Sequence, residues 1–269
     1  RVYISITLIG LSTPQTKSIL KTVAHDYSLN YSNDNLLSEK SKLKFRRVIA
    51  IENIHYLEPN GTEIIKDVSL KLEKNKIIGL KGKTGSGKTT LVNLILGLLK
   101  PTIGFIRCDE TIIENTNLRK YQNLFALVSQ DLEIASMDAR GNIAFSEKRN
   151  LVDEKKLKAS AKFVEIEHLL DINTKRLQGS QAETEKILSG GEKQRLSIAR
   201  AIYANRDIII LDELSSALDK KTEANIIKKL LDLKKTKTLL IISHSKEMLK
   251  ICDVIFEISE GKIKEKKDQ

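Results

Sequence analysis

The stretch Gly82-Lys-Thr-Gly-Ser-Gly-Lys88-Thr89 decides the fold, because it matches the pattern G-x-x-x-x-G-K-[ST] at every fixed position. Glycines let such a loop curl until its backbone N–H groups point inward at phosphate oxygens, and the following helix adds the positive end of its dipole. The apolar run Ile77–Leu80 precedes the loop, and apolar residues recur at helical spacing over Leu91–Leu99. The sequence therefore predicts a strand, a phosphate-binding loop and a helix in this order.

The same loop offers ligands for a nucleoside triphosphate and its metal ion. We expect the Lys88 ammonium to bind the β- and γ-phosphates and the Thr89 hydroxyl to bind Mg²⁺. The other residues that we expect to contact the nucleotide here are Gly82, Thr84, Gly85, Ser86, Gly87 and Thr90. The alternative, a glycine-rich turn with a chance lysine, does not account for the strand before the loop and the helix after it.

Two acidic residues, Asp212 and Glu213, come directly after the apolar run Asp207–Leu211. The carboxyl ends of parallel strands form the edge at which such folds bind ligands. We therefore expect Asp212 to hold Mg²⁺ through water and Glu213 to polarise the attacking water as a general base. Taken alone, the pair would be an ordinary acidic turn or helix cap, and the phosphate loop is what favours the catalytic interpretation.

The rest of the chain predicts an α/β fold with a mainly parallel sheet. Thr238–Ile242 and Val254–Ile258 are further apolar runs of strand length, and helical segments separate them as in βαβ units. Val48–Tyr56 and Ile64–Leu72 flank a Pro-Asn-Gly turn, which predicts an antiparallel β subdomain. Residues from about 132 to 190 carry helical patterns without comparable strands and predict an inserted helical subdomain.

Composition bears on the partners. The 46 Lys and Arg residues against 35 Asp and Glu give a net charge of +11, which would suit nucleic acid or an anionic membrane surface. The lysines are scattered and aromatic residues make up only 4%, so we favour a solvated surface with no nucleic-acid partner. No stretch is long and apolar enough to cross a bilayer. Cys108 and Cys252 lie far apart in sequence, and we expect both to be reduced core residues of a cytosolic protein.

The octet Leu188-Ser-Gly-Gly-Glu-Lys-Gln-Arg195 closely resembles the signature of ABC transporter ATPases, with Glu192 where glutamine is usual. Because both nucleotide motifs occur in the same order, residues from about 46 to 265 resemble an ABC ATPase domain, which implies the P-loop NTPase type of α/β fold. The Ser189 hydroxyl, free N–H groups and a helix over Glu192–Ala204 would form an anion site. The resemblance implies that Ser189, Gly190, Gly191 and Glu192 grip the γ-phosphate of an ATP that is held by a second ATPase domain, in a head-to-tail dimer.

Three further residues gain a role from this resemblance. Gln130 is similar to the Q-loop glutamine, which touches Mg²⁺ and water and senses the transmembrane part. Asp219 ends Ser216-Ala-Leu-Asp219, which resembles the D-loop that crosses the dimer interface. His244 follows the predicted strand Thr238–Ser243 and resembles the switch histidine that contacts the γ-phosphate. Judged alone, His244 would be a structural histidine and Gln130 a surface residue.

Two segments resemble exporters within this family. Asp138–Phe145 resembles the segment that receives coupling helices, and Glu183 lies where exporters carry a glutamate, although Gln181-Ala-Glu183 departs from the usual Val-Gly-Glu. Arg1–Leu20 vaguely resembles the cytosolic end of a last transmembrane helix. We therefore expect residues 1–45 to be a linker and the end of a truncated transmembrane domain, and the chain to be a piece of a longer protein.

Together these resemblances imply the ATP-hydrolysing motor of an exporter or lipid flippase. Its partners would be a second ATPase domain and a transmembrane domain in the same chain, at the cytoplasmic face of the cell membrane. The alternative is a non-transport ABC ATPase acting on nucleic acid or the ribosome. About a hundred residues separate the phosphate loop from the signature, too few for the coiled coil of the DNA-repair members. A non-hydrolysing module is disfavoured because Lys88, Asp212, Glu213 and His244 are all present.

The adenine site departs from the exporter pattern. Exporters stack adenine on an aromatic residue at the end of the first strand, and an ungapped alignment of Asn53–Pro59 puts Glu58 at that position. Tyr56 lies two residues earlier, and residues two apart in a strand point to the same face. Tyr56 could therefore reach the base if the loop shifts, or it could merely pack in the hairpin.

Overall fold

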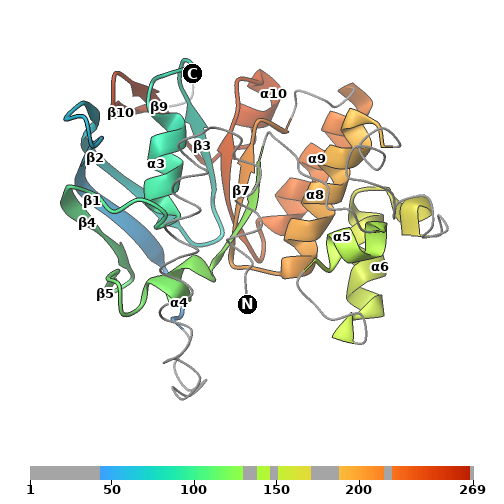
Figure 1. Ribbon diagram of the computed structural model, residues 1–269. Helices are drawn as coiled ribbons and strands as arrows, with labels where there is room; N and C mark the ends of the chain where they lie inside the picture. Colours follow the sequence, from blue (N-terminus) through green and yellow to red (C-terminus); the bar gives the residue numbers. More distant parts are fainter. Residues whose placement is uncertain (1–42, 130–137, 146–150, 171–187, 215–219, 267–269) are drawn as a thin grey trace.

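The computed structural model describes residues 43–129, 138–145, 151–170, 188–214 and 220–266 (Figure 1). An antiparallel sheet of four strands has the order β2-β1-β4-β5, and a sheet of six strands has the order β10-β9-β3-β8-β7-β6. The antiparallel strands are β1 (Val48–Leu57), β2 (Glu63–Glu73), β4 (Ile103–Cys108) and β5 (Thr111–Ile112). The strands of the second sheet are β3 (Ile77–Lys81), β6 (Phe125–Val128), β7 (Ile208–Asp212), β8 (Thr238–Ile242), β9 (Val254–Ser259) and β10 (Lys262–Lys266).

The six-stranded sheet is parallel except at one edge, where β10 pairs with β9 in antiparallel fashion. The described helices are α3 (Lys88–Ile95), α4 (Leu118–Gln122), α5 (Ala139–Ile143), α6 (Glu154–Phe163), the 3₁₀ helix η3 (Glu167–Leu170), α8 (Gly190–Ala204), α9 (Lys220–Leu233) and α10 (Lys246–Leu249). The predicted α/β fold with its antiparallel subdomain is therefore confirmed. In the predicted helical stretch, the described elements are α5, α6, η3 and the start of α8.

Two hydrophobic cores lie on opposite faces of the parallel sheet. One contains α3 and the inward face of the antiparallel sheet, and the other contains α5, α6, α8 and α9. Figure 1 shows α3 on one side of the sheet and the helical layers on the other. Alternate residues of one strand point to opposite faces, so on β7 Ile208 and Ile210 enter the first core whereas Ile209 and Leu211 enter the second. Continuous apolar runs in β7 and β8 follow from this burial on both sides.

Helix α3 differs from the prediction at both ends. It begins at Lys88 rather than Leu91 and ends at Ile95 rather than Leu99. Gly97 has a φ of +67°, and a Cβ on this residue would lie 2.7 Å from Leu118 Cδ1. The helix ends early because the chain turns at Gly97, where only glycine combines this backbone conformation with so close a neighbour.

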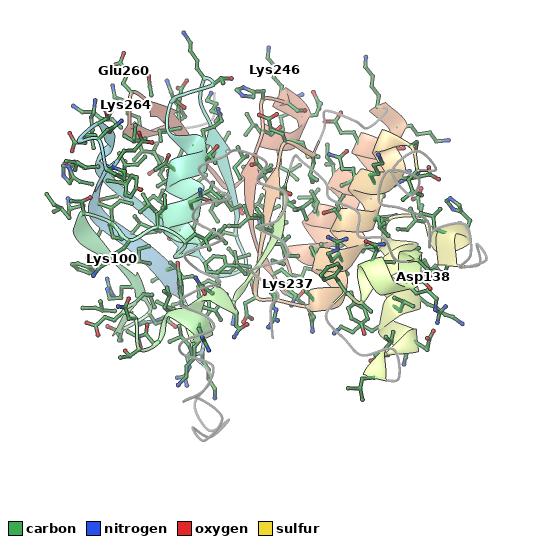
Figure 2. All side chains as sticks on the ribbon, viewed as in Figure 1. Lys100, Asp138, Lys237, Lys246, Glu260 and Lys264 are labelled. Carbon is green, nitrogen blue, oxygen red and sulfur yellow. The ribbon has the colours of Figure 1, made fainter. Side chains whose placement is uncertain are left out.

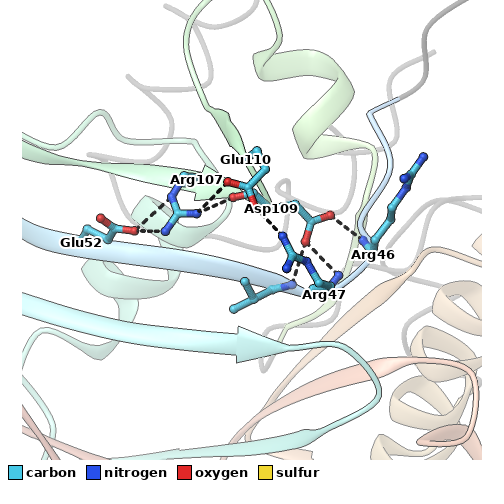
Figure 3. Close-up of polar contacts among 7 residues, drawn as sticks. Arg46, Arg47, Glu52, Arg107, Asp109 and Glu110 are labelled. Atoms are coloured by element: carbon cyan, nitrogen blue, oxygen red, sulfur yellow. Dashed lines mark hydrogen bonds and ion pairs between the residues drawn. The ribbon is translucent and has the colours of Figure 1, made fainter.

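The start of the domain is held by a carboxylate clamp around Asp109, in the turn between β4 and β5 (Figure 3). Its carboxylate accepts the backbone N–H groups of Arg46, Arg47 and Val48 at 2.7, 2.8 and 2.9 Å. Burial would raise the pKa of Asp109, but these three donors and the Arg47 charge hold that pKa below its ordinary value. Phe45, directly before the clamp, is buried in the first core, so the packed domain begins before Arg46.

The basic residues are spread over the surface. Figure 2 shows Lys100, Lys237, Lys246 and Lys264 at well-separated edges of the molecule. None of the described helices is both long enough and apolar enough to cross a membrane. Cys108 and Cys252 are buried and form no disulfide, and burial raises the pKa of the Cys108 thiol to about 12. Both cysteines are therefore core residues, and the Cys108 thiol stays protonated at neutral pH.

Candidate nucleotide-binding site

The phosphate loop lies between β3 and α3. A Cβ on Gly82 would lie 2.4 Å from the carbonyl oxygen of Ile258, so no side chain fits there. Gly85 and Gly87 have φ values of +76° and +102°, which L-residues rarely adopt. Gly87 is also the N-cap residue of α3, and the first turn of this helix contains no acidic residue. The N-terminus of α3 therefore keeps the positive field that attracts an anion.

The polar groups of the loop suit a phosphate ligand. The Lys88 ammonium donates to the carbonyl oxygens of Gly82 and Lys83, the latter at 2.9 Å, so it lies folded over the loop. The Ser86 hydroxyl is buried and has no hydrogen-bond partner among the described residues. A buried hydroxyl without a partner is costly, and phosphate oxygens would supply the missing acceptor. Thr89 is exposed and Thr84 is too, so both are accessible to a ligand.

The two carboxylates and the histidine lie at the ends of neighbouring strands. Asp212 is the last residue of β7 and is opposite Ile242, the last residue of β8. Strand β8 in turn lies beside β3, which leads into the phosphate loop. Because all three strands are parallel, Asp212, His244 and the loop share one edge of the sheet. This is the edge at which we expected the catalytic residues.

Glu213 and His244 face each other at this edge. The distance from Glu213 Oε1 to His244 Nε2 is 3.9 Å, within range for an ion pair when the histidine is protonated. Glu213 has a φ of +50°, and its N–H donates to the Ile242 carbonyl oxygen at 2.9 Å. The carboxylate is only partly exposed. The structure thus brings together two of the three predicted catalytic side chains, and the third, Lys88, is the first residue of α3, directly after the phosphate loop.

The signature helix α8 begins two residues earlier than predicted, at Gly190, with Ser189 as its N-cap. The Ser189 hydroxyl accepts the Glu192 N–H at 3.2 Å, while the Glu192 carboxylate accepts the Ser189 N–H and hydroxyl at 2.9 and 2.7 Å. The two residues thus form a reciprocal capping box. The hydrogen bond from the Ser189 hydroxyl is the main cause that lowers the pKa of the Glu192 carboxyl. The Ser189 hydroxyl is therefore already bonded to Glu192 within this chain, which the sequence did not predict. Gly190 and Gly191 form the first turn and leave the helix end accessible.

Tyr56 lies on the antiparallel hairpin, directly opposite Ile65. Residues paired in this way have side chains on the same face of the sheet. A Cβ on Gly87 would lie 3.1 Å from Ile65 Cδ1, so this face covers the phosphate loop. Tyr56 is partly buried against the same core, and burial followed by the Glu58 charge raises the pKa of its hydroxyl. The tyrosine is thus on the face of the hairpin that covers Gly87.

Several predicted residues lie outside the described ranges. They are Gln130, Glu183, Asp219 and the segment Arg1–Leu20. The exporter-like segment 138–145 is described: Asp138 caps α5 through a bond from the Gly141 N–H, and Asn142 is buried.

Two contacts of the signature helix were missed by the sequence analysis. Arg200 donates to the backbone and side-chain oxygens of Asn142 at 2.9 and 3.0 Å, which ties α8 to α5. Gln194 donates to the carbonyl oxygen of Glu213 at 3.5 Å. The two residues of the first pair are 58 positions apart in the sequence, and those of the second pair are 19 apart. No local sequence pattern predicts contacts between residues so far apart.

Comparison with known proteins agrees with this geometry. The family model described as ABC transporter matches residues 65–216. The β-(1→2)glucan export ATP-binding/permease protein NdvA of Bartonella henselae is 33% identical over 218 residues, which are 81% of this chain and 36% of NdvA. The multidrug resistance ABC transporter ATP-binding/permease protein YheI of Bacillus subtilis, described as probable, is 34% identical over 221 residues, 81% of this chain and 37% of that protein. The chain thus spans little more than a third of the length of these relatives.

Solved structures match over most of the chain. A dimeric bacterial ABC transporter cassette has a TM-score of 0.69 and 26% identity, and the match covers 81% of this chain and 98% of the cassette. A bacterial Atm1-family ABC exporter with ATP bound has a TM-score of 0.74 and 23% identity, covering 91% of this chain and 43% of the exporter, and shows the fold. Sequence, geometry and these similarities together show that the chain belongs to the ABC transporter family and contains its nucleotide-binding ATPase domain.

Proposed function

We propose that this chain is the motor of an exporter, in which ATP hydrolysis at the edge of the parallel sheet drives transport through a membrane domain. The observation that carries the proposal is the convergence of three groups at one sheet edge. They are the phosphate loop after β3, the Asp212–Glu213 pair after β7 and His244 after β8. The names of relatives support the exporter class. They include a glucan exporter and an ATP-dependent lipid A-core flippase of Saccharophagus degradans, which is 31% identical to this chain over 217 residues.

In this proposal the phosphates lie over the N-terminus of α3. Lys88 exchanges its bonds to the loop carbonyls for the β- and γ-phosphates, and the Ser86 hydroxyl and loop N–H groups complete the cradle. Mg²⁺, when bound, neutralises charge on the phosphates. Thr89 and Asp212 offer the hard oxygen ligands that Mg²⁺ prefers, and Gln130 would add a third. Two or three protein oxygens suit an ion that keeps water and phosphate ligands.

Glu213 is the proposed general base, and His244 the proposed contact to the γ-phosphate. The carboxylate orients the attacking water and accepts its proton as the new O–P bond forms. The bond between the γ-phosphorus and the β–γ bridging oxygen breaks in the same displacement, and ADP is the leaving group. His244, 3.9 Å from the carboxylate, lies close enough to act on the same phosphate. Tyr56 is proposed to contact the adenine, because it is on the face of the hairpin that covers Gly87.

The second half of each site is proposed to come from another chain. Ser189 and the first turn of α8 would bind the γ-phosphate held by the partner, with Asp219 at the interface. A solved relative is a dimeric cassette, which supports this pairing. The relatives are ATP-binding/permease proteins, which supports a membrane domain as the further partner. We propose the cytoplasmic face of the membrane as the location.

Glu213→Gln tests the proposal because it removes the base while keeping the shape of the side chain. We expect ATP binding to persist and hydrolysis to slow by about a hundredfold or more. With ATP the variant should elute as a dimer in size-exclusion chromatography, and without nucleotide as a monomer. Glu247→Gln, on the exposed surface of α10, is the matched control and should hydrolyse ATP normally. Wild-type turnover by Glu213→Gln would refute the assignment.

A further inference from the structure

Gln194 is an unusual residue of the signature helix. It is only 4% exposed, its amide nitrogen donates to the Glu213 carbonyl oxygen at 3.5 Å, and its amide oxygen is buried without a partner among the described residues. A buried carbonyl without a donor destabilises the fold, and an apolar side chain of the same size would avoid that loss. The polar group therefore requires an explanation other than stability.

The backbone that Gln194 contacts is unusual as well. Glu213 has a φ of +50°, a left-handed conformation that glutamate seldom adopts. Such a conformation persists only where its surroundings fix it. On one side the Glu213 N–H donates to Ile242 on β8, and on the other the Glu213 carbonyl faces Gln194 on α8. The orientation of the Glu213 side chain thus depends on two elements at once.

We propose that Gln194 is a positioning residue for Glu213, and that it couples the two nucleotide sites of a dimer. The inference rests on the proposed function. The N-terminus of α8 would bind the phosphate held by the partner, whereas Glu213 serves the nucleotide of its own chain. Gln194 lies five residues after Ser189 on this same helix. If α8 shifts when its N-terminus binds the phosphate held by the partner, the Gln194 side chain would therefore transmit that shift to Glu213.

Gln194→Met separates this role from packing. Methionine is unbranched and of similar length, so it fills the same space without the donor and without the unpaired oxygen. In the 269-residue chain we expect kcat to fall about tenfold, since misplacing a catalytic group can cost up to about a hundredfold. The KM for ATP should stay within about twofold, the cooperativity of the rate with ATP should disappear, and Tm should be unchanged or higher. Ser197→Ala, also buried on α8, is the control and should leave all four quantities as in wild type.

The outcomes discriminate between the two proposals. An unchanged kcat in Gln194→Met, or a kcat that falls together with Tm, would overturn the inference. If the methionine variant does not fold, Gln194→Leu, which also lacks a hydrogen-bond donor, should show the same loss of kcat. Failure of both variants to fold would assign Gln194 a purely structural role and also overturn the inference. If the wild-type chain itself does not hydrolyse ATP, the proposed function fails and the inference with it.

Discussion

The N-termini of α3 and α8 are both expected to bind phosphate, yet they are built in opposite ways. Helix α3 starts at a left-handed glycine, has no side-chain cap and has no acidic residue in its first turn. Helix α8 starts with a complete capping box, in which the Glu192 carboxylate already lies at the helix end. The N-terminus of α3 can accept a phosphate of the nucleotide bound to its own chain. The N-terminus of α8 is satisfied by its own side chains, so an incoming phosphate has to compete with a carboxylate already in place.

Lys88→Ala should abolish phosphate binding at the N-terminus of α3. It removes the only side-chain cation of the loop that we assign to the phosphates, while the capping box of α8 is left intact. We expect ATP affinity in isothermal titration calorimetry to fall by at least about a hundredfold, equivalent to about 2.7 kcal/mol or more. Lys83→Ala, whose exposed side chain belongs to the same loop, is the control. If Lys88→Ala bound ATP as tightly as wild type, the N-terminus of α3 would not be the phosphate site that we distinguish from the N-terminus of α8.

Ser189→Ala should affect the α8 end only. Loss of the N-cap hydroxyl should destabilise the chain by about 1 kcal/mol and weaken ATP-dependent dimerisation by about tenfold or more. The affinity of a single chain for ATP should not change, because that ATP lies on α3. Dimerisation can be measured by sedimentation in the Glu213→Gln background. A loss of single-chain ATP affinity would show that the two ends belong to one site.

Tyr56→Ala asks whether the α3 end holds the base as well as the phosphates. If Tyr56 stacks on adenine, affinity for ATP should fall about tenfold, since one aromatic stack contributes about 1–3 kcal/mol. Affinity for inorganic triphosphate should remain as it was. The measurement is competition between ATP, GTP and triphosphate on both proteins. Equal affinities in wild type and variant would leave Tyr56 as a packing residue of the hairpin.

Asp109 is, like Glu192, a carboxylate bound to backbone N–H groups, but we assign no phosphate to its site. Asp109→Asn should lower the free energy of unfolding at pH 7 by about 1–2 kcal/mol, through loss of charge-assisted bonds to residues 46–48. Because folding lowers the pKa of Asp109, this stabilisation is present above about pH 4 and is lost as the pH falls further. Urea unfolding of both proteins at pH 7 and pH 3.5 measures it. A difference that grows in acid would contradict the clamp.

The sequence predicted most of the fold and the edge that carries the site. Apolar runs such as Thr238–Ile242 and the spacing of the phosphate loop are local signals, and they placed β8 and β3 correctly. The end of α3 was wrong because the close approach of Leu118 to Gly97 is a tertiary contact. In the same way, the sequence showed that Ser189 starts a helix without showing that Glu192 turns back onto its hydroxyl.

Tyr56 shows the limit of counting along a strand. The pairing of β1 with β2 shifts register near Ile54, where Asn53 has a φ of +46°. Such irregularities change which residues face the loop and leave no clear mark in the sequence. Gln194 lies within the recognised octet, but its contact to Glu213 depends on how α8 packs beside β7. The sheet edge that carries Asp212, Glu213 and His244 was thus predictable, whereas their side-chain contacts were not.

The central strands β7 and β8 send alternate side chains into two separate cores. If either core unfolds, one face of β7 and β8 is exposed, and the same two strands also form part of the other core. The two halves should therefore unfold in a single cooperative transition, although the sequence divides them into a nucleotide-binding part and a helical part. Nucleotide bound on the α3 side would then raise the melting temperature of the helical side by the same amount. Calorimetry with and without ATP would show one peak that moves as a whole.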